Sequence, residues 1–387
     1  MSKKVRGMVS CLDECDSWLL LSVLILCLLG TLMVFSAASF RYEALNADTG
    51  HFHYLLKHIS RLALGVGVML MLANLDYRHL NRRLLNWSML AGGLVFVVAP
   101  FVLMGLTAGN CTRWFNFFGL FPVQPIEFVK VTLILFMAER LACAPRGAVV
   151  DRRRLLWALL APATIVIVLA MQPNFGNVLV ISLLTIIILF MAGASLSLVA
   201  SLTGILAGGA ALGVMIIDKL QGRVDGWLAG LVTGKFAYQV DQSLISLGAG
   251  GVVGQGFGAS HQRFWFLPEG HTDFIISVLG EELGLLGTFG TIGLFMVFAM
   301  RGLAIARRAG DSFGRITAIG LTSLIALYVV ANIGMATGLL PVMGLPLPFV
   351  SYGGSALVTN LAAVGILLSI DRQSRSYQKW RHRWETA

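Results

Sequence analysis

The chain has 387 residues, of which 57% are hydrophobic and only 12% are charged, against about 25% charged in an ordinary soluble domain. This composition excludes a soluble globular protein, because too few polar side chains remain to cover its surface. The formal net charge of +10 does not indicate nucleic-acid binding, since the basic residues lie in the short links between apolar blocks, where they signal membrane orientation. The five cysteines are scattered and predict neither a disulfide framework nor a zinc site.

Long apolar blocks follow one another along the whole chain, each close to the roughly 20 residues that cross a hydrocarbon core of about 30 Å. Helices are the expected spanning elements, because each satisfies its own backbone hydrogen bonds. The first block is too long for a signal-peptide core and is expected to be an uncleaved span. The blocks lie at about 17–38, 59–75, 84–106, 125–142, 155–172, 177–194, 196–217, 273–300, 316–340 and 350–370. The sequence therefore predicts an all-α polytopic membrane protein with about ten transmembrane helices, forming one domain over 1–387 with short tails at about 1–16 and 371–387.

The basic residues give this bundle an orientation. Most of the 29 lysines and arginines lie in the N-terminal tail, near 78–83, 140–154 and 301–315, and in the C-terminal tail. The positive-inside rule places these segments, and hence both termini, in the cytoplasm. The segments at 39–58, 107–124 and 218–272 are then extracytoplasmic. Arg61 and Lys130 are exceptions, because they fall within or at the edge of spans.

The outer segment at about 218–272 is too long for a simple connector. It contains an amphipathic run from Tyr238 to Leu247 and a glycine-rich stretch from Gly248 to Gly258. No strand precedes this stretch, so a dinucleotide loop is not predicted. We expect the glycines to let the backbone turn tightly against the membrane surface.

The fourth span opens with a proline followed by a pair of opposite charges. Glu127 and Lys130 lie at i and i+3, on one face of the predicted helix. Arg113, in the aromatic segment just before, is expected at the membrane interface. These residues form either an intramembrane ion pair with an interfacial anchor or a cationic site for an anionic headgroup, which arginine and lysine hold by charge-assisted hydrogen bonds.

The eighth span carries acids at its outer end and deeper in the membrane. Asp273 is either a first-turn acid that favours the helix dipole or a functional group, and His271 is either a proton carrier or a loop residue that caps its neighbour. Glu281, eight residues after Asp273, shares roughly its helix face. Buried acids need partners, and Lys130 and Arg113 are candidates.

The link between the ninth and tenth spans contains Pro341, Pro346 and Pro348 and continues into Ser351-Tyr352-Gly353-Gly354-Ser355. Such a run predicts a broken or re-entrant backbone, which is tolerated at membrane depth only where protein or a water-filled cavity satisfies it. Either it is a structural kink or it borders a site.

Together these segments resemble the SEDS family, the shape, elongation, division and sporulation proteins represented by FtsW and RodA. The resemblance runs in family order across nearly the whole chain. The matching runs are Arg113-Trp114, Gln124-Pro125 with Glu127 and Lys130, Gln172-Pro173 with Gly176, Leu267-Pro268-Glu269 with His271-Thr272-Asp273-Phe274, Gly280 to Gly284, and Pro348 with Ser351 to Ser355.

The resemblance implies an inverting peptidoglycan glycosyltransferase that polymerises lipid II at the outer face of the bacterial cytoplasmic (inner) membrane. Its essential aspartate corresponds to Asp273, which as general base would take the proton of the attacking hydroxyl. Arg113 and Lys130, with a divalent cation such as Mg²⁺ or Mn²⁺ as a further candidate, would offset the charge of the departing pyrophosphate. Other candidate substrate contacts are Glu127, Glu269, His271, Glu281, Ser351, Tyr352 and Gly353.

One position departs from the family pattern. Where the family commonly has an acid in a Gln-Pro-Asp-x-Gly-Thr run, this chain has Asn174. The missing charge would weaken any attraction for a metal ion or a basic partner at this place, so the metal is left unassigned.

Expected partners are lipid II, a class B penicillin-binding protein, other divisome or elongasome membrane proteins and membrane lipids. The stretch Gly254 to Gln262 favours the FtsW type, whereas Pro341 to Pro348 is closer to RodA; the FtsW type is slightly favoured. A lipid II flippase would also need about ten spans, broken helices and buried charge, but no motif pairs the two halves of the chain. A noncatalytic scaffold would not need acids and lysine at membrane depth.

Overall fold

The computed structural model describes residues 15–43, 53–103, 115–117, 121–142, 152–260, 270 and 272–385. Within them every predicted apolar block forms one helix. The elements are α2 (Ser17–Glu43), α3 (His53–Asn74), the 3-10 turn η1 (Tyr77–Leu80), α4 (Arg83–Leu103), strands β1 (Phe115–Phe117) and β2 (Phe121–Val123), α5 (Pro125–Leu141), α6 (Arg152–Met171), α7 (Phe175–Met191), α8 (Leu196–Ile216), α9 (Asp218–Thr233), α10 (Tyr238–Ala249), α12 (Ile275–Arg308), α13 (Ser312–Ala336) and α14 (Gly354–Glu385).

The helices confirm an all-α membrane-protein architecture with one small antiparallel hairpin, β1–β2. Seven helices are long and apolar enough to cross a bilayer, namely α2, α3, α6, α8, α12, α13 and α14. The apolar parts of α4 and α7 are shorter, and α5 is interrupted by charges. Ten spans therefore remain a prediction. The junction at 192–195 is a turn between α7 and α8, and Gly193 there adopts a φ of +90°.

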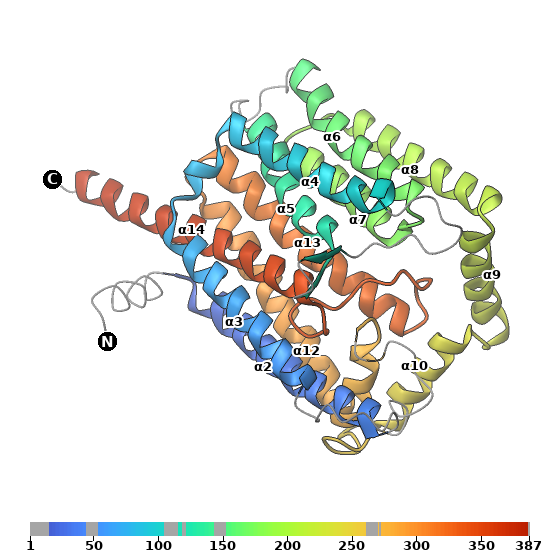
Figure 1. Ribbon diagram of the computed structural model, residues 1–387. Coiled ribbons are helices and arrows are strands. Elements are labelled where there is room, and N and C mark those ends of the chain that lie inside the picture. The colour runs from blue at the N-terminus through green and yellow to red at the C-terminus, as the bar shows by residue number, and fades with distance from the viewer. Residues whose placement is uncertain are drawn as a thin grey trace.

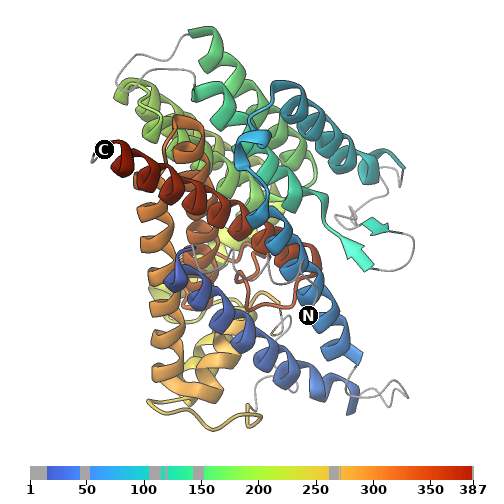
Figure 2. The same ribbon diagram turned by 90° about the vertical axis from the view of Figure 1, so that its left-hand side faces the viewer.

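Helices α13 and α14 lie at the centre of the bundle. Of the residues in their apolar stretches, 72% and 78% are buried, whereas none is buried in the apolar stretch of α8. Close approach at α13 depends on small residues, because a Cβ on Gly320 would lie 2.5 Å from Ile134 of α5. Helix α14 lies beside α3, and α12 runs along the length of the bundle (Figures 1 and 2).

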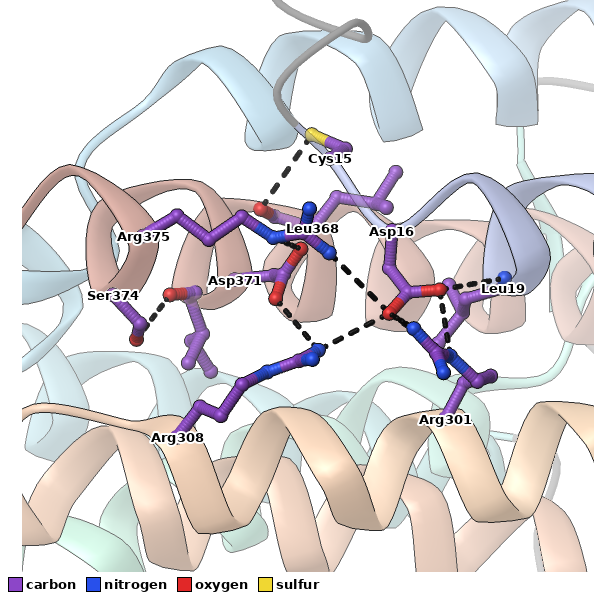
Figure 3. A network of polar contacts seen from close by, with 10 residues as sticks. Cys15, Asp16, Leu19, Arg301, Arg308, Leu368, Asp371, Ser374 and Arg375 are labelled. Carbon is purple, nitrogen blue, oxygen red and sulfur yellow. Dashed lines mark hydrogen bonds and ion pairs between the residues drawn. The ribbon is translucent and has the colours of Figure 1, made fainter. Parts of the chain in front are cut away.

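One end of the bundle is built from charged side chains, and we call it the basic end (Figure 3). Asp16, just before α2, accepts a hydrogen bond of 2.9 Å from Arg301 and one of 3.1 Å from Arg308. Arg308 also pairs with Asp371 of α14 at 3.1 Å, and Arg375 pairs with the same acid at 2.8 Å. These ion pairs join the start of α2 to α12 and α14 at this end.

Helix α12 is broken about a third of the way from its N-terminus, where Gly284 adopts φ 67° and ψ −164°. The glycine-rich stretch fills the break: Gln255 donates to the carbonyl of Glu281 at 2.9 Å, and the Leu285 amide donates to the carbonyl of Gly251 at 2.9 Å. The glycines turn the backbone as expected, with positive φ at Gly251, Gly254, Gly256 and Gly258; whether they lie against a membrane surface stays a prediction. The sequence did not predict that this stretch also supplies hydrogen bonds at the break of α12, where only glycine fits at position 284, because a Cβ there would lie 2.3 Å from the Gly254 nitrogen.

The predicted break before the last span is confirmed. Residues 341–347 form no regular element between α13 and α14, yet Leu345, Leu347 and Val350 are fully buried. The Leu347 amide donates to Ser351 Oγ at 2.8 Å. Side chains of the protein thus form hydrogen bonds with the backbone of this segment, through Ser351 and Asn332.

Candidate functional site

The candidate site lies at the end of the bundle opposite the basic end, where three segments meet around Asp273. Asn332 of α13 donates to the carbonyl of Asp273 and to that of Leu345, both at 2.7 Å. Ser351 donates to the carbonyl of Thr272 at 2.5 Å. The aspartate is therefore held between the start of α12, the middle of the bundle and the broken link before α14.

Asp273 does not occupy the N-cap position of α12, which is Phe274. The Asp273 side chain is half-buried, and its Oδ2 lies 3.5 Å from the point where a Cβ on Gly344 would sit. Gly344 therefore lies directly beside the carboxylate, and its φ of +68° favours glycine at this position.

Glu281 and Glu282 lie deeper in α12 and are each 1% exposed. Glu281 accepts a hydrogen bond from Ser260 at 2.5 Å, and Glu282 accepts one from Ser36 of α2. Lys130, which the sequence suggested as a partner for Glu281, does not contact it. The two acids accept instead from serines of other segments: Ser260 follows the glycine-rich stretch, and Ser36 belongs to α2.

Lys130 forms a second buried cluster with its predicted partner. Its ammonium group lies 2.8 Å from Glu127, which confirms the i, i+3 ion pair, and it also contacts Asn177 at 3.4 Å and the Tyr328 hydroxyl. The Tyr328 hydroxyl donates to Asn177 Oδ1 at 2.8 Å. Helices α5, α7 and α13 thus share one buried cation.

Asn174, the position that departs from the family acid, joins this cluster indirectly. It accepts a hydrogen bond of 3.1 Å from Asn177. Lys130 is therefore balanced by one carboxylate, Glu127, and by neutral oxygens.

The remaining predicted residues divide into two groups. Ser351 is buried, and Tyr352 and Gly353 are half-buried beside it. Arg113, Glu269 and His271 lie outside the described residues. Within the described ranges no three histidines, cysteines or acids come close enough to hold a metal ion. The donors around Asp273 that the structure describes thus do not fit a metal site.

Two residues on α3 were not predicted as part of the site. The Arg61 guanidinium carbon lies 5.0 Å from the centre of the Tyr352 ring, and the His58 ring stacks on the same tyrosine at 6.2 Å. The sequence did contain a signal, since Arg61 is a charge within an apolar block. Its contact with a residue almost 300 positions away could not be read from that signal.

A pocket of about 290 Å³ opens beside the site. It lies between α9, α10 and the broken link, and its walls include Arg223, Trp227 and Phe236. Arg223 donates to the carbonyl of Val342 at 3.4 Å, and Trp227 donates to that of Gly338 at 2.9 Å. Helices α9 and α10 thus form a helical arm, and α9 packs on the link between α13 and α14 (Figure 1).

The chain is similar to known proteins along most of its length. The family model described as cell cycle protein (FtsW, RodA, SpoVE) matches residues 17–376. Stage V sporulation protein E of Bacillus subtilis is 34% identical over 368 residues, covering 93% of this chain and 98% of that protein. A probable peptidoglycan glycosyltransferase FtsW of Trichlorobacter lovleyi is 37% identical, covering 93% of each.

Solved structures show the same architecture. A chain of a peptidoglycan synthase complex that coordinates polymerization and crosslinking superposes with a TM-score of 0.74 at 25% identity, covering 93% of this chain and 98% of that one. The rod shape determining protein RodA of Thermus thermophilus superposes with a TM-score of 0.66 at 26% identity, covering 93% and 97%.

Proposed function

The chain belongs to the SEDS family of cell cycle proteins and is a multi-pass membrane protein and peptidoglycan glycosyltransferase, and from this premise we propose that it polymerises lipid II with Asp273 as general base. One observation carries the assignment of the base. Three segments distant in sequence converge on Asp273, and Gly344 lies directly beside its carboxylate.

The proposed membrane is the bacterial cytoplasmic membrane. The arginines around Asp16 and Asp371 mark the basic end as cytoplasmic by the positive-inside rule. Asp273 then faces the outer surface, where a substrate with a polyprenyl tail in the bilayer can present its sugars to water.

In the proposed reaction the 4-hydroxyl oxygen of an acceptor sugar attacks the anomeric carbon of the donor. The new C–O bond forms as the bond from that carbon to the pyrophosphate oxygen breaks, and the electron pair leaves with the pyrophosphate. Asp273 takes the hydroxyl proton. This single displacement inverts the anomeric centre and needs no covalent intermediate on the protein.

Lys130 and Glu127 lie deep in the bundle and are 1% and 4% exposed. Their depth supports a role in positioning the start of α5 beside the start of α14, where the Gln124 amide donates to Ser355 Oγ at 3.1 Å. Direct contact of Lys130 with substrate would require the cluster to open.

The proposed protein partner is a class B penicillin-binding protein, which would crosslink the strands that this chain makes. The similarity to a polymerising and crosslinking complex supports this pairing. The FtsW-named relatives support a role in division, within a larger assembly of membrane proteins.

The test is glycan-strand formation from purified lipid II by the detergent-solubilised protein bound to its penicillin-binding partner. We expect polymer from the wild type and at least about a hundredfold less from Asp273→Ala, the usual minimum contribution of general base catalysis. Equal polymer from both would move the base elsewhere, with Glu281→Gln the next variant. No polymer from either in a confirmed complex would contradict the enzyme assignment and favour a transporter.

A further inference from the structure

Two polar side chains on α3, His58 and Arg61, have no role in the proposed reaction. His58 is 1% exposed, and its Nε2 atom is buried without a hydrogen-bond partner. Arg61, one helical turn further on, is half-buried. The centre of the His58 ring lies 6.2 Å from the centre of the Tyr352 ring, and the Arg61 guanidinium carbon lies 5.0 Å from the same point.

An arginine within an apolar helix normally pairs with an acid, because an unpaired charge at membrane depth is costly. The buried cations that the structure describes follow this rule: Lys130 pairs with Glu127, and Arg140 pairs with Glu139. Arg61 takes part in no ion pair among the residues that the structure describes. Its described contact is with an aromatic ring, which contributes only about 0.5–2 kcal/mol.

The packing leaves space for the guanidinium group. A Cβ on Gly354 would lie 2.9 Å from Arg61 Nε, so a larger residue there would displace the arginine. Tyr352 in turn adjoins Ser351, which donates to the carbonyl of Thr272 next to Asp273. The His58–Arg61 pair is therefore connected to the proposed base through Tyr352, Ser351 and Thr272.

We propose that His58 and Arg61 form a binding site for the pyrophosphate group of the lipid-linked substrate. This inference rests on the proposed function and adds a subsite to it. Arg61 supplies a charge and a fork of N–H donors, and His58 supplies a ring nitrogen, Nε2, that has no hydrogen-bond partner in the protein. Tyr352 holds both side chains toward the link that carries Ser351.

The subsite also accounts for the position of these cations within a membrane helix. A polyprenyl pyrophosphate places its phosphates at the boundary between hydrocarbon and water, while its tail stays in the bilayer. Arg61 lies about two turns into α3 from His53. When the C–O bond to the donor sugar breaks, the negative charge grows on the pyrophosphate oxygen, where a preorganised cation stabilises it most.

The test measures binding without turnover, using full-length protein in nanodiscs of neutral phosphatidylcholine. The probe is undecaprenyl pyrophosphate, and the comparison ligands are undecaprenol, which lacks phosphate, and inorganic pyrophosphate, which lacks the tail. We expect undecaprenyl pyrophosphate to bind at least about tenfold more tightly than undecaprenol. Arg61→Gln and His58→Leu should each remove about tenfold of that preference, and Arg61→Lys should retain part of it.

Arg83→Gln is the matched control, because Arg83 is an exposed arginine at the basic end, and it should bind as the wild type does. If Arg61→Gln does not fold, Gly354→Ala displaces the same guanidinium group and replaces it in the test. Unchanged binding in Arg61→Gln, or equal competition by phosphatidylglycerol vesicles, would overturn the proposal. A polymerisation assay in parallel separates the two claims, since Arg61-dependent binding without polymer would contradict the proposed function and leave the anion site standing.

Discussion

At the residue scale, the buried charges of this protein fall into groups with different partners. Lys130 has one acid and two neutral oxygens around it, whereas Asp16 accepts from three arginines, Arg301, Arg308 and Arg375. Removing one member of a buried pair leaves the other charge without compensation, which typically costs about 3–5 kcal/mol. Variants that restore neutrality therefore separate structural from functional roles.

Lys130→Met should destabilise the protein by about 3 kcal/mol, because Glu127 then stays buried without its cation. The double variant Glu127→Gln/Lys130→Met should recover most of this loss in thermal unfolding. If the double variant also polymerises as the wild type does, Lys130 is structural. If stability returns and activity does not, Lys130 has a role in the reaction, and the positioning role proposed above is contradicted.

Asp16→Asn should lower stability by about 2 kcal/mol, less than for a fully buried pair because its arginines are about one-third exposed. Burial acts to raise the pKa of Asp16, but hydrogen bonds from Arg301, the Leu19 amide and Arg308 outweigh it and hold the pKa below 3.8. A lowered pKa stabilises the fold above pH 3.8 and loses that effect as pH falls further. The difference between wild type and variant in thermal unfolding should therefore be constant above about pH 4 and shrink below it; a difference that grows on acidification would contradict this assignment.

At the element scale, the broken helix α12 is the feature on which the site depends most. The break at Gly284 lets residues 251–256 replace helical hydrogen bonds, and it fixes Glu281 and Glu282 beside their serine donors. An unbroken α12 would turn these acids and shift Asp273 relative to Ser351.

Gly284→Ala should therefore destabilise the protein by about 2–3 kcal/mol and reduce polymer formation. The added Cβ would clash with the backbone of Gly254, and φ of +67° is strained for alanine. Gly290→Ala in the same helix is the control, because nothing lies within 4 Å of its Cβ position and alanine favours a helix interior. Equal behaviour of the two variants would show that the break is not required.

The sequence predicted the helices well because a membrane span needs a continuous apolar block, and each block became one helix. It also predicted the Glu127–Lys130 pair, since partners three residues apart on a helix are local. It could not predict that Gly254 fills the break at Gly284, that Ser36 pairs with Glu282, or that His58 and Arg61 meet Tyr352. Each of these contacts joins distant segments, and the chain offers many alternative partners for each residue.

At the scale of the whole molecule, the basic end and the candidate site lie at opposite ends of the bundle. The arginines around Asp16 form the basic end, and the segments around Asp273, with the arm of α9 and α10, form the other. This separation agrees with the proposed synthesis at the outer surface of the membrane.

The orientation can be measured in cells with single cysteines in a cysteine-free background. Lys235→Cys lies in the exposed turn between α9 and α10. It should react with a membrane-impermeant maleimide in cells that have lost their outer membrane and wall but keep an intact cytoplasmic membrane. Arg82→Cys, exposed at the basic end, should react only after the membrane is permeabilised. The reverse pattern would place Asp273 in the cytoplasm and contradict the proposed site of synthesis.

The central claim is that this chain joins lipid-linked sugars at the outer surface and does not carry them across the bilayer. The most direct test uses proteoliposomes that contain the protein with its penicillin-binding partner and lipid II in one leaflet, with polymer and leaflet distribution read from the same vesicles. We predict polymer from the wild type without movement of lipid II between leaflets, and neither from Asp273→Asn. Movement of lipid II without polymer, unaffected by Asp273→Asn, would contradict the account.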